Sequence, residues 1–137
     1  DILVQRGNTI EYVGVAAVYR GEPNRFVYPD LMMKLRVSSA FDVGFIHLAM
    51  REESARDFLR ARASGTSGSM PKINQTTLKS LPLPIPPLAE QRRIVAKVEQ
   101  LMALVDQLEV QLAASRAIAA NLLEAMVAEL TGKNSRV

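Results

Sequence analysis

The stretch "SLPLPIPPLAEQRRIVAKVEQ" (residues 80–100) changes character in its middle. Its first half contains four of the chain's seven prolines, which are Pro82, Pro84, Pro86 and Pro87. Pro87 suits the first turn of a helix, because its φ is already helical and its missing N–H has no partner there. Glu90 adds a negative charge near the positive end of the helix dipole. The stretch therefore predicts a junction at which a long helix begins near Leu88.

The residues just before this helix alternate between aliphatic side chains and proline. In an extended chain Leu81, Leu83 and Ile85 share one face, and all the missing N–H groups belong to one edge. We expect an outermost strand that pairs through its other edge and is protected by its prolines from further pairing. A proline-rich linker of polyproline type is the alternative.

The predicted helix is long and carries a regular apolar seam. No Pro or Gly occurs from Leu88 to Leu130, and Gly132 supplies a C-terminal stop. At 1.5 Å per residue this is roughly 64 Å of helix. A repeat of about 3.5 residues is typical of a coiled coil, which requires a partner helix. The predicted helix–helix interface consists of Ile94, Val98, Leu101, Val105, Leu108, Leu112, Ala119, Leu122 and Met126. Ser115 interrupts the seam, either as a tolerated small residue or as a residue that sets the register.

The residues before the junction mix strand and helix patterns. Strands are expected in "DILV" (1–4), "VGVAAVYR" (13–20) and "FVYPDLMMKLRV" (26–37), in a meander-like arrangement. Helical spacing follows in residues 41–51 and 53–63, and residues 76–81 predict one helical turn capped by Thr76. The predicted fold class is α+β, with a small mixed β/α head followed by one long coiled-coil-forming helix. The corresponding domains are residues 1–87, 88–131 and a tail of 132–137.

Composition restricts the class of protein. The chain of 137 residues has no cysteine, which excludes disulfides and thiolate metal sites and fits a reducing compartment, so we expect a cytoplasmic protein. No run is long and apolar enough for a membrane span. Residues 1–88 hold 11 Lys and Arg against 8 Asp and Glu, whereas residues 89–137 hold 6 of each. The start at "DILVQRGN" already reads as a strand, so we expect that sequence precedes it in the parent protein.

Neither a metal site nor an enzyme signature is found. The single histidine, His47, has no cysteine or carboxylate at ligand spacing, so a structural role is expected. No phosphate-binding loop and no nucleophile elbow are present. Polar and basic residues instead gather in "QRGNT" (5–9), "RARASGTSGS" (60–69) and "KIN" (72–74), together with Lys34 and Arg36. Such loops can contact phosphates and base edges, but ordinary surface loops have the same composition.

Nearly the whole sequence resembles a known family, most strongly from Gly65 to Gly132. The run "LPLPIPPLAEQRRI" (81–94), continuing into a long helix, resembles the specificity subunit of type I restriction-modification enzymes. "DILVQRGN" (1–8), "YPDLMMKLR" (28–36) and "SGTSGSMPKIN" (64–74) resemble the later part of its target-recognition domain. "NLLEAMVAELTG" (121–132) resembles the end of the family's last helix. The resemblance implies a C-terminal fragment with part of one recognition domain and the following spacer helix.

The resemblance also implies a function. Recognition domains of this family each read half of a split DNA sequence, and two antiparallel helices hold them apart. Methylation subunits dock on this scaffold and supply S-adenosylmethionine chemistry, a restriction subunit cuts, and the specificity subunit itself catalyses nothing and holds no cofactor. Candidate DNA-binding residues in the loops are Arg6, Asn8, Thr66, Ser67, Ser69, Lys72 and Asn74.

Two further expectations concern partners. With one spacer helix present, the fragment is expected to form a homodimer through residues 94–126. The alternative function is a structural coiled-coil dimerisation module whose head does not read DNA. The target sequence and the spacing of its halves do not follow from the sequence.

Overall fold

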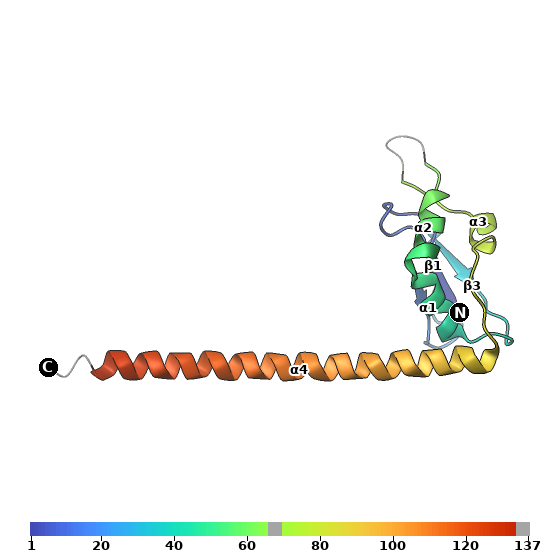
Figure 1. Ribbon diagram of the computed structural model, residues 1–137. Helices are drawn as coiled ribbons and strands as arrows, with labels where there is room; N and C mark the ends of the chain where they lie inside the picture. Colours follow the sequence, from blue (N-terminus) through green and yellow to red (C-terminus); the bar gives the residue numbers. More distant parts are fainter. Residues whose placement is uncertain (66–69, 134–137) are drawn as a thin grey trace. The chain divides into compact units, whose positions relative to one another are not determined.

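The computed structural model describes residues 1–65 and 70–133. Its backbone forms two compact units, Asp1–Val95, which we call the head, and Ala96–Val137 (Figure 1). The head contains a three-stranded antiparallel sheet and helices, and a long helix follows it in the chain. The predicted α+β class is confirmed.

The sheet consists of β1 (Ile2–Gln5), β2 (Ala16–Val18) and β3 (Met32–Leu35). All three expected strands form. β1 has the expected length, whereas β2 and β3 are shorter than the stretches that predicted them. Their order is β2-β1-β3, so β1 is the central strand and pairs antiparallel with both others. The predicted meander is therefore wrong. The connection over residues 19–31 carries the chain past β1 to its second edge, and a period-2 pattern does not reveal which edge a strand will take.

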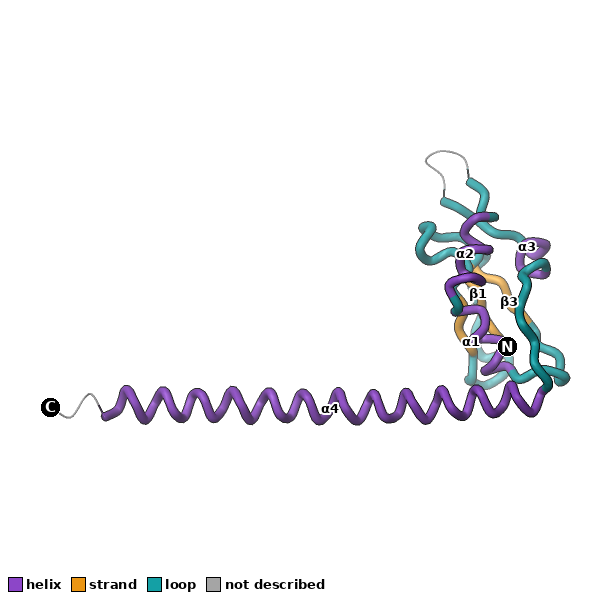
Figure 2. The backbone as a smooth tube through the Cα atoms, viewed as in Figure 1, coloured by secondary structure: helices purple, strands orange, loops and turns teal. Residues whose placement is uncertain are grey.

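Helices α1 (Val43–Arg51) and α2 (Glu53–Ala61) confirm the two helices predicted from the apolar spacing. They follow one another alongside the sheet (Figure 2). The carboxylate of Asp42 caps α1 by accepting a hydrogen bond from the Phe45 amide at 3.0 Å. Side chains of both helices join the sheet in one core, whose buried members include Ile2, Val4, Phe45, Ile46, Met50 and Leu59.

Helix α3 (Gln75–Lys79) forms where one helical turn was predicted, but its cap differs. The Oδ1 of Asn74 accepts a hydrogen bond from the Thr77 amide at 2.8 Å. Thr76, the predicted cap, lies inside the helix. Asparagine and threonine both cap helices, and asparagine does so more strongly.

The proline-rich segment is not a strand. Residues 81–87 belong to no sheet, and in the described part of the chain residues 82–86 make no backbone hydrogen bond to a strand. The predicted edge strand is therefore wrong, and the segment is an unpaired connection between α3 and α4. Leu81 and Leu83 nevertheless pack against the core while Pro82 and Pro84 are exposed. Because proline has no backbone N–H, the prolines of this segment cannot donate the hydrogen bonds of a strand. The leucine side chains hold the segment on the head instead.

Helix α4 (Leu88–Lys133) begins directly after Pro87, as predicted. It contains 46 residues, which is about 69 Å at 1.5 Å per residue. It extends to Lys133, one residue beyond Gly132, where the sequence predicts its end. None of the helices within residues 1–65 and 70–133 combines the length and hydropathy that crossing a membrane requires.

Gln91, in the first turns of α4, is buried with 1% of its surface exposed. Its Nε2 donates to the Pro86 carbonyl at 2.8 Å, and its Oε1 accepts from the Asp42 amide at 2.9 Å. The side chain therefore joins the proline segment, the start of α1 and the start of α4. Ile94 and Val95 of α4 pack against the core of the head beside it.

The variant Gln91→Leu should lower the free energy of unfolding of the head by about 2 kcal/mol or more. It removes both hydrogen bonds and leaves the Asp42 amide and the Pro86 carbonyl unpaired. Urea denaturation of the chain, followed by circular dichroism, measures the change. Gln107→Leu, at an exposed position of α4, is the matched control and should change stability by less than about 0.5 kcal/mol. Equal stability of the two variants would contradict this role of Gln91.

Candidate nucleic-acid interface

One end of the head is built where three loop segments meet. Lys72 pairs with Ser64 through two backbone hydrogen bonds of 2.9 and 3.0 Å. The neighbouring Ile73 amide donates to the Arg6 carbonyl at 2.9 Å, and the Asn8 amide donates to the Pro71 carbonyl at 3.4 Å. The candidate loops before residue 9 and after residue 70 are thus held together by their backbones.

Gly7 permits this close approach. A Cβ at Gly7 would lie 3.0 Å from Cγ of Lys72 and 3.3 Å from side-chain atoms of Leu31 and Met70. A larger residue would require these three side chains to shift by a few tenths of an ångström. The small size of glycine therefore suits the close packing of the loops, which the sequence alone does not show.

Four of the seven candidate DNA-binding residues lie in the described part of this end. Arg6 is half exposed and forms an ion pair with Asp30 at 3.9 Å. Asn8 is partly exposed, and its Oδ1 accepts a hydrogen bond from the Thr9 amide at 2.8 Å. Lys72 and Asn74 are exposed, and Asn74 caps α3 as described above. Thr66, Ser67 and Ser69 lie outside the described residues.

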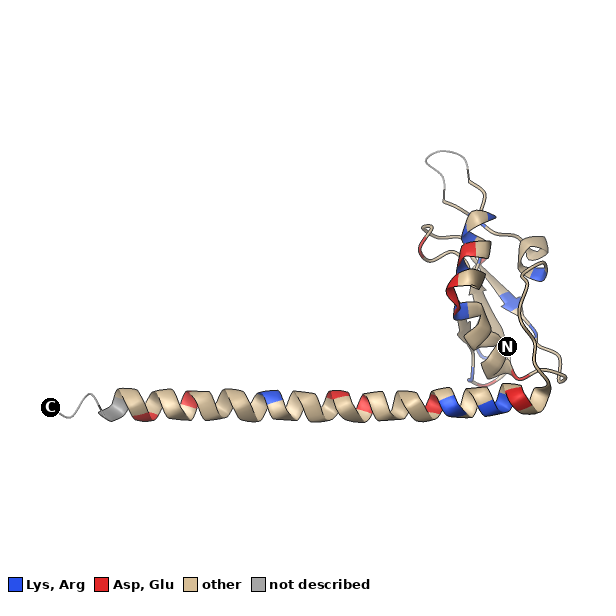
Figure 3. Cartoon of the chain, viewed as in Figure 1, with Lys and Arg blue, Asp and Glu red and all other residues tan. Residues whose placement is uncertain are grey.

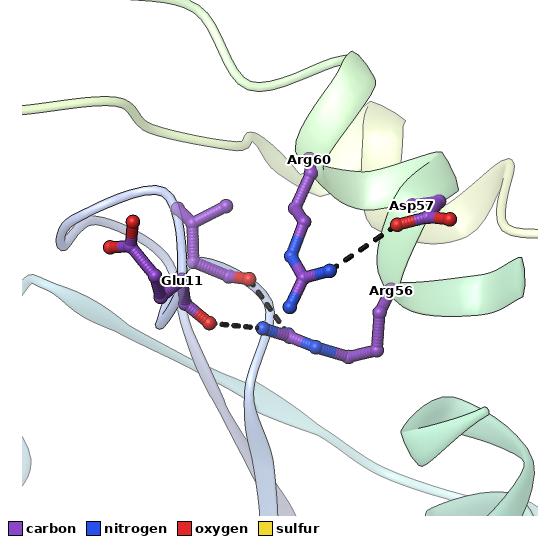
Figure 4. A network of polar contacts seen from close by, with 5 residues as sticks. Glu11, Arg56, Asp57 and Arg60 are labelled. Atoms are coloured by element: carbon purple, nitrogen blue, oxygen red, sulfur yellow. Dashed lines mark hydrogen bonds and ion pairs between the residues drawn. The ribbon is translucent and has the colours of Figure 1, made fainter. Parts of the chain in front are cut away.

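A buried arginine that sequence reasoning missed holds the neighbouring loop in place. Arg56 of α2 has 8% of its surface exposed. Its guanidinium donates to the Val13 carbonyl at 2.7 Å and to the Glu11 carbonyl at 2.6 Å. Figure 4 shows Arg56 reaching from α2 to the loop that contains Glu11. Its position three residues before Leu59, on the buried side of α2, was the signal available in the sequence.

Three charged side chains, those of Glu11, Asp57 and Arg60, lie near Arg56. Burial lowers the pKa of Arg56, and the nearby guanidinium of Arg60 lowers it further, although it stays fully charged at neutral pH. Arg60 forms an exposed ion pair with Asp57 at 3.3 Å. A side-chain hydrogen bond from Thr9 holds the pKa of Glu11 below its usual range. The buried cation is thus satisfied by backbone carbonyls, which ties it to the path of the loop.

The loop takes a sharp turn at Gly14, beside this contact. Gly14 has a φ of +74°, and a Cβ there would lie 2.6 Å from Cδ1 of Leu59. Both the positive φ and the lack of space require glycine. Arg56 and Gly14 together fix the loop that runs from the candidate residue Asn8 to β2.

The variant Arg56→Met should lower the free energy of unfolding by about 2–3 kcal/mol, because two carbonyls lose a charged donor. Arg60→Met breaks only an exposed ion pair and should lose less than about 1 kcal/mol. Denaturant titration of both variants measures this difference. If Arg56→Met lowered the free energy of unfolding less than Arg60→Met, Arg56 would not hold the loop as described. Hydrogen exchange should also become faster at the amides of residues 12–15 in Arg56→Met.

The predicted helix–helix interface divides between the two units. Ile94 packs against the core of the head, and Val98 is half-buried. The remaining candidates are exposed, namely Leu101, Val105, Leu108, Leu112, Ala119, Leu122 and Met126. Ser115 is exposed among them. Beyond the head, α4 therefore presents a seam of large apolar side chains to solvent.

His47 has a structural contact. Its Nε2 lies 3.0 Å from the Ala16 carbonyl, so the imidazole joins α1 to β2. Within residues 1–65 and 70–133, no group of three or more His, Cys, Asp or Glu residues could hold a metal ion.

Comparison with known proteins gives the family. The model of the type I restriction modification DNA specificity domain matches residues 1–114. The EcoKI specificity subunit of Escherichia coli strain K12 is 30% identical over 131 residues, which are 94% of this chain and 28% of that protein. The StySPI specificity subunit of Salmonella potsdam is 36% identical over 113 residues, 81% of this chain and 24% of that protein.

The Escherichia coli EcoEI specificity subunit is 27% identical over 127 residues, 92% of this chain and 21% of that protein. This chain thus spans between about a fifth and somewhat more than a quarter of the length of these relatives. The matched region includes the loop end of the head, the proline segment and the first part of α4. The chain belongs to the type I restriction modification DNA specificity domain family.

Proposed function

We propose that this chain is part of the DNA-specificity subunit of a type I restriction-modification complex, in which its head reads one half of a bipartite DNA target. Membership of the family is the observation that carries the proposal. The head supports it with an end at which Arg6, Asn8, Lys72 and Asn74 come together on loops. Arginine, lysine and asparagine are the side chains that most often contact phosphates, guanine and adenine.

In this proposal α4 is the spacer and the scaffold. Its exposed seam requires a second helix, because large apolar side chains contribute about 1.5–3 kcal/mol each when they are removed from water. The methylation subunits dock on the paired helices and bring S-adenosylmethionine and the methyl transfer with them. A restriction subunit completes the complex. The chain itself positions DNA and catalyses no step.

A structural role is the second candidate. The exposed seam of α4 also suits a coiled-coil dimerisation module whose head does not contact DNA. The two candidates differ in what the head does. Dependence of DNA methylation on residues of the head therefore decides between them.

Mapping of methylated adenines tests the specificity role. The full-length protein, co-expressed with its methylation subunit, should produce methylation at one split sequence motif. The double variant Arg6→Ala and Asn8→Ala should relax one half of the motif and leave the other half unchanged, because each bidentate base contact discriminates by about 1–3 kcal/mol.

Arg116→Ala, on the exposed surface of α4, is the control for this experiment and should preserve the whole motif. An assembled complex that methylates no split motif would refute the specificity role. Methylation of an unchanged motif by the double variant would instead show that Arg6 and Asn8 do not read bases.

We also propose that the chain, when isolated, forms a homodimer through the seam of α4. Light scattering at micromolar concentrations should give the mass of two chains. Leu108→Asp should yield a monomer, because it places a charge in the apolar seam. Gln107→Asp adds the same charge one residue away, off the seam, and should leave the dimer intact. A monomeric wild-type chain would rule out self-association.

A further inference from the structure

A second group of basic residues gathers on the head, along β3 and α3. Lys34 belongs to β3, Arg36 follows it, and Lys79 ends α3. Figure 3 shows basic positions on both elements. All three residues are exposed. Lys34 and Arg36 belong to the polar and basic set noted in the sequence, but none of the three is among the seven candidate DNA-binding residues.

Three cavities place these cations next to one another. Lys34 and Lys79 line a cavity of about 590 Å³ between β3 and α3. Lys34 and Arg36 line a second cavity of about 500 Å³, and Arg36 and Lys79 line a third of about 500 Å³. Each pair of cations therefore shares one of the three cavities. We call the basic surface that Lys34, Arg36 and Lys79 form along β3 and α3 the β3 groove.

The positive charge of the β3 groove is poorly balanced. Asp1 lies 3.5 Å from Lys34. Within residues 1–65 and 70–133, no ion pair joins Arg36 or Lys79 to an acidic residue. Like charges that lie close together on a surface repel one another and attract an anionic partner. The groove is therefore complementary to a polyanion.

Aromatic side chains form one wall of the same groove. Tyr19, Phe26 and Tyr28 line the cavity shared by Lys34 and Arg36. Tyr19 and Phe26 contact each other edge to face with ring centroids 6.4 Å apart. The guanidinium of Arg25 lies 5.4 Å from the centroid of Phe26, although 69% of the surface of that residue stays exposed. Phe26 and Tyr28 thus present exposed apolar surface beside the cations.

The β3 groove is continuous with the proposed DNA-reading end. Arg6 and Asn74, which belong to that end, also line the cavity shared by Lys34 and Lys79. Asp30 forms an ion pair with Arg6 at the same cavity. A DNA duplex held at the loops would therefore reach the groove without a gap.

We propose that the β3 groove, through Lys34, Arg36 and Lys79, binds the phosphate backbone of duplex DNA beside the bases that the loops read. The proposal rests on the proposed DNA-specificity function. It assigns a different task to these residues, because phosphate contacts fix the register and orientation of the protein on DNA but carry no sequence information. The three residues should contribute to affinity and hardly to the choice of sequence.

The salt dependence of DNA binding tests this. The full-length protein, assembled with its methylation subunits, is titrated with a duplex that carries its methylated motif and with a duplex that lacks it. Each lost phosphate contact should reduce the slope of log K against log salt by about 0.9. The triple variant Lys34→Gln, Arg36→Gln and Lys79→Gln should therefore lose about 2.7 from the slope on both duplexes. The ratio of the two affinities should stay unchanged.

The control variant removes the same charge elsewhere. Arg51→Gln, Arg92→Gln and Lys97→Gln change three exposed cations that line none of the three groove cavities. This variant should keep the slope of the wild-type complex. Thermal unfolding followed by circular dichroism should give both variants the melting temperature of the wild type. A reduced slope of log K against log salt then indicates lost phosphate contacts and not unfolding.

The outcomes separate the two proposals. If the wild-type complex prefers no duplex, the specificity function fails. If it prefers its motif and the triple variant keeps the full slope, the β3 groove does not bind DNA and the present inference is overturned. Loss of a methylation subunit from the triple variant, seen as a lower mass of the complex, would make the groove a protein interface and would also overturn it.

Discussion

The buried side chain of Gln91 is the interaction on which the arrangement of the head depends. An amide can donate and accept at once, and Gln91 uses both functions, on the Pro86 carbonyl and on the Asp42 amide. It therefore fixes where the proline segment ends, where α1 begins and where α4 starts. Leu81 and Leu83 hold the same segment by apolar contacts. Because proline offers no N–H for strand pairing, this joint depends on side chains.

Loop positions in the head are determined in a similar way. The strands are short, and long connections lie between them, so backbone ladders alone cannot fix the loops. Lys72 and Gly7 bring two loops together by backbone contacts, and the buried guanidinium of Arg56 holds the loop before β2. These contacts leave the side chains of Lys72 and Asn74 exposed at one end. A surface that reads DNA needs this combination of a fixed backbone and free polar groups.

Helix α4 has two kinds of surface along its length. Its first turns are part of the core of the head, where Ile94 and Val95 pack. From Leu101 to Leu130 its apolar side chains are exposed. A repeat of about 3.5 residues with exposed apolar side chains is the pattern that a partner helix covers in a coiled coil. The same chain thus contains a compact head with its own core and a helix with a long exposed apolar seam.

The sequence by itself determined the α+β class, the helices α1 and α2, the start of α4 and the 3.5-residue seam, because local spacing and proline chemistry act within a few residues. It suggested the loops around Arg6, Asn8, Lys72 and Asn74 from composition. Only the tertiary structure decided the strand order β2-β1-β3, the unpaired proline segment, the cap at Asn74, the role of Arg56 and the meeting of Lys34, Arg36 and Lys79. These features join residues that are far apart in the chain, and their geometry arises only when the core has packed.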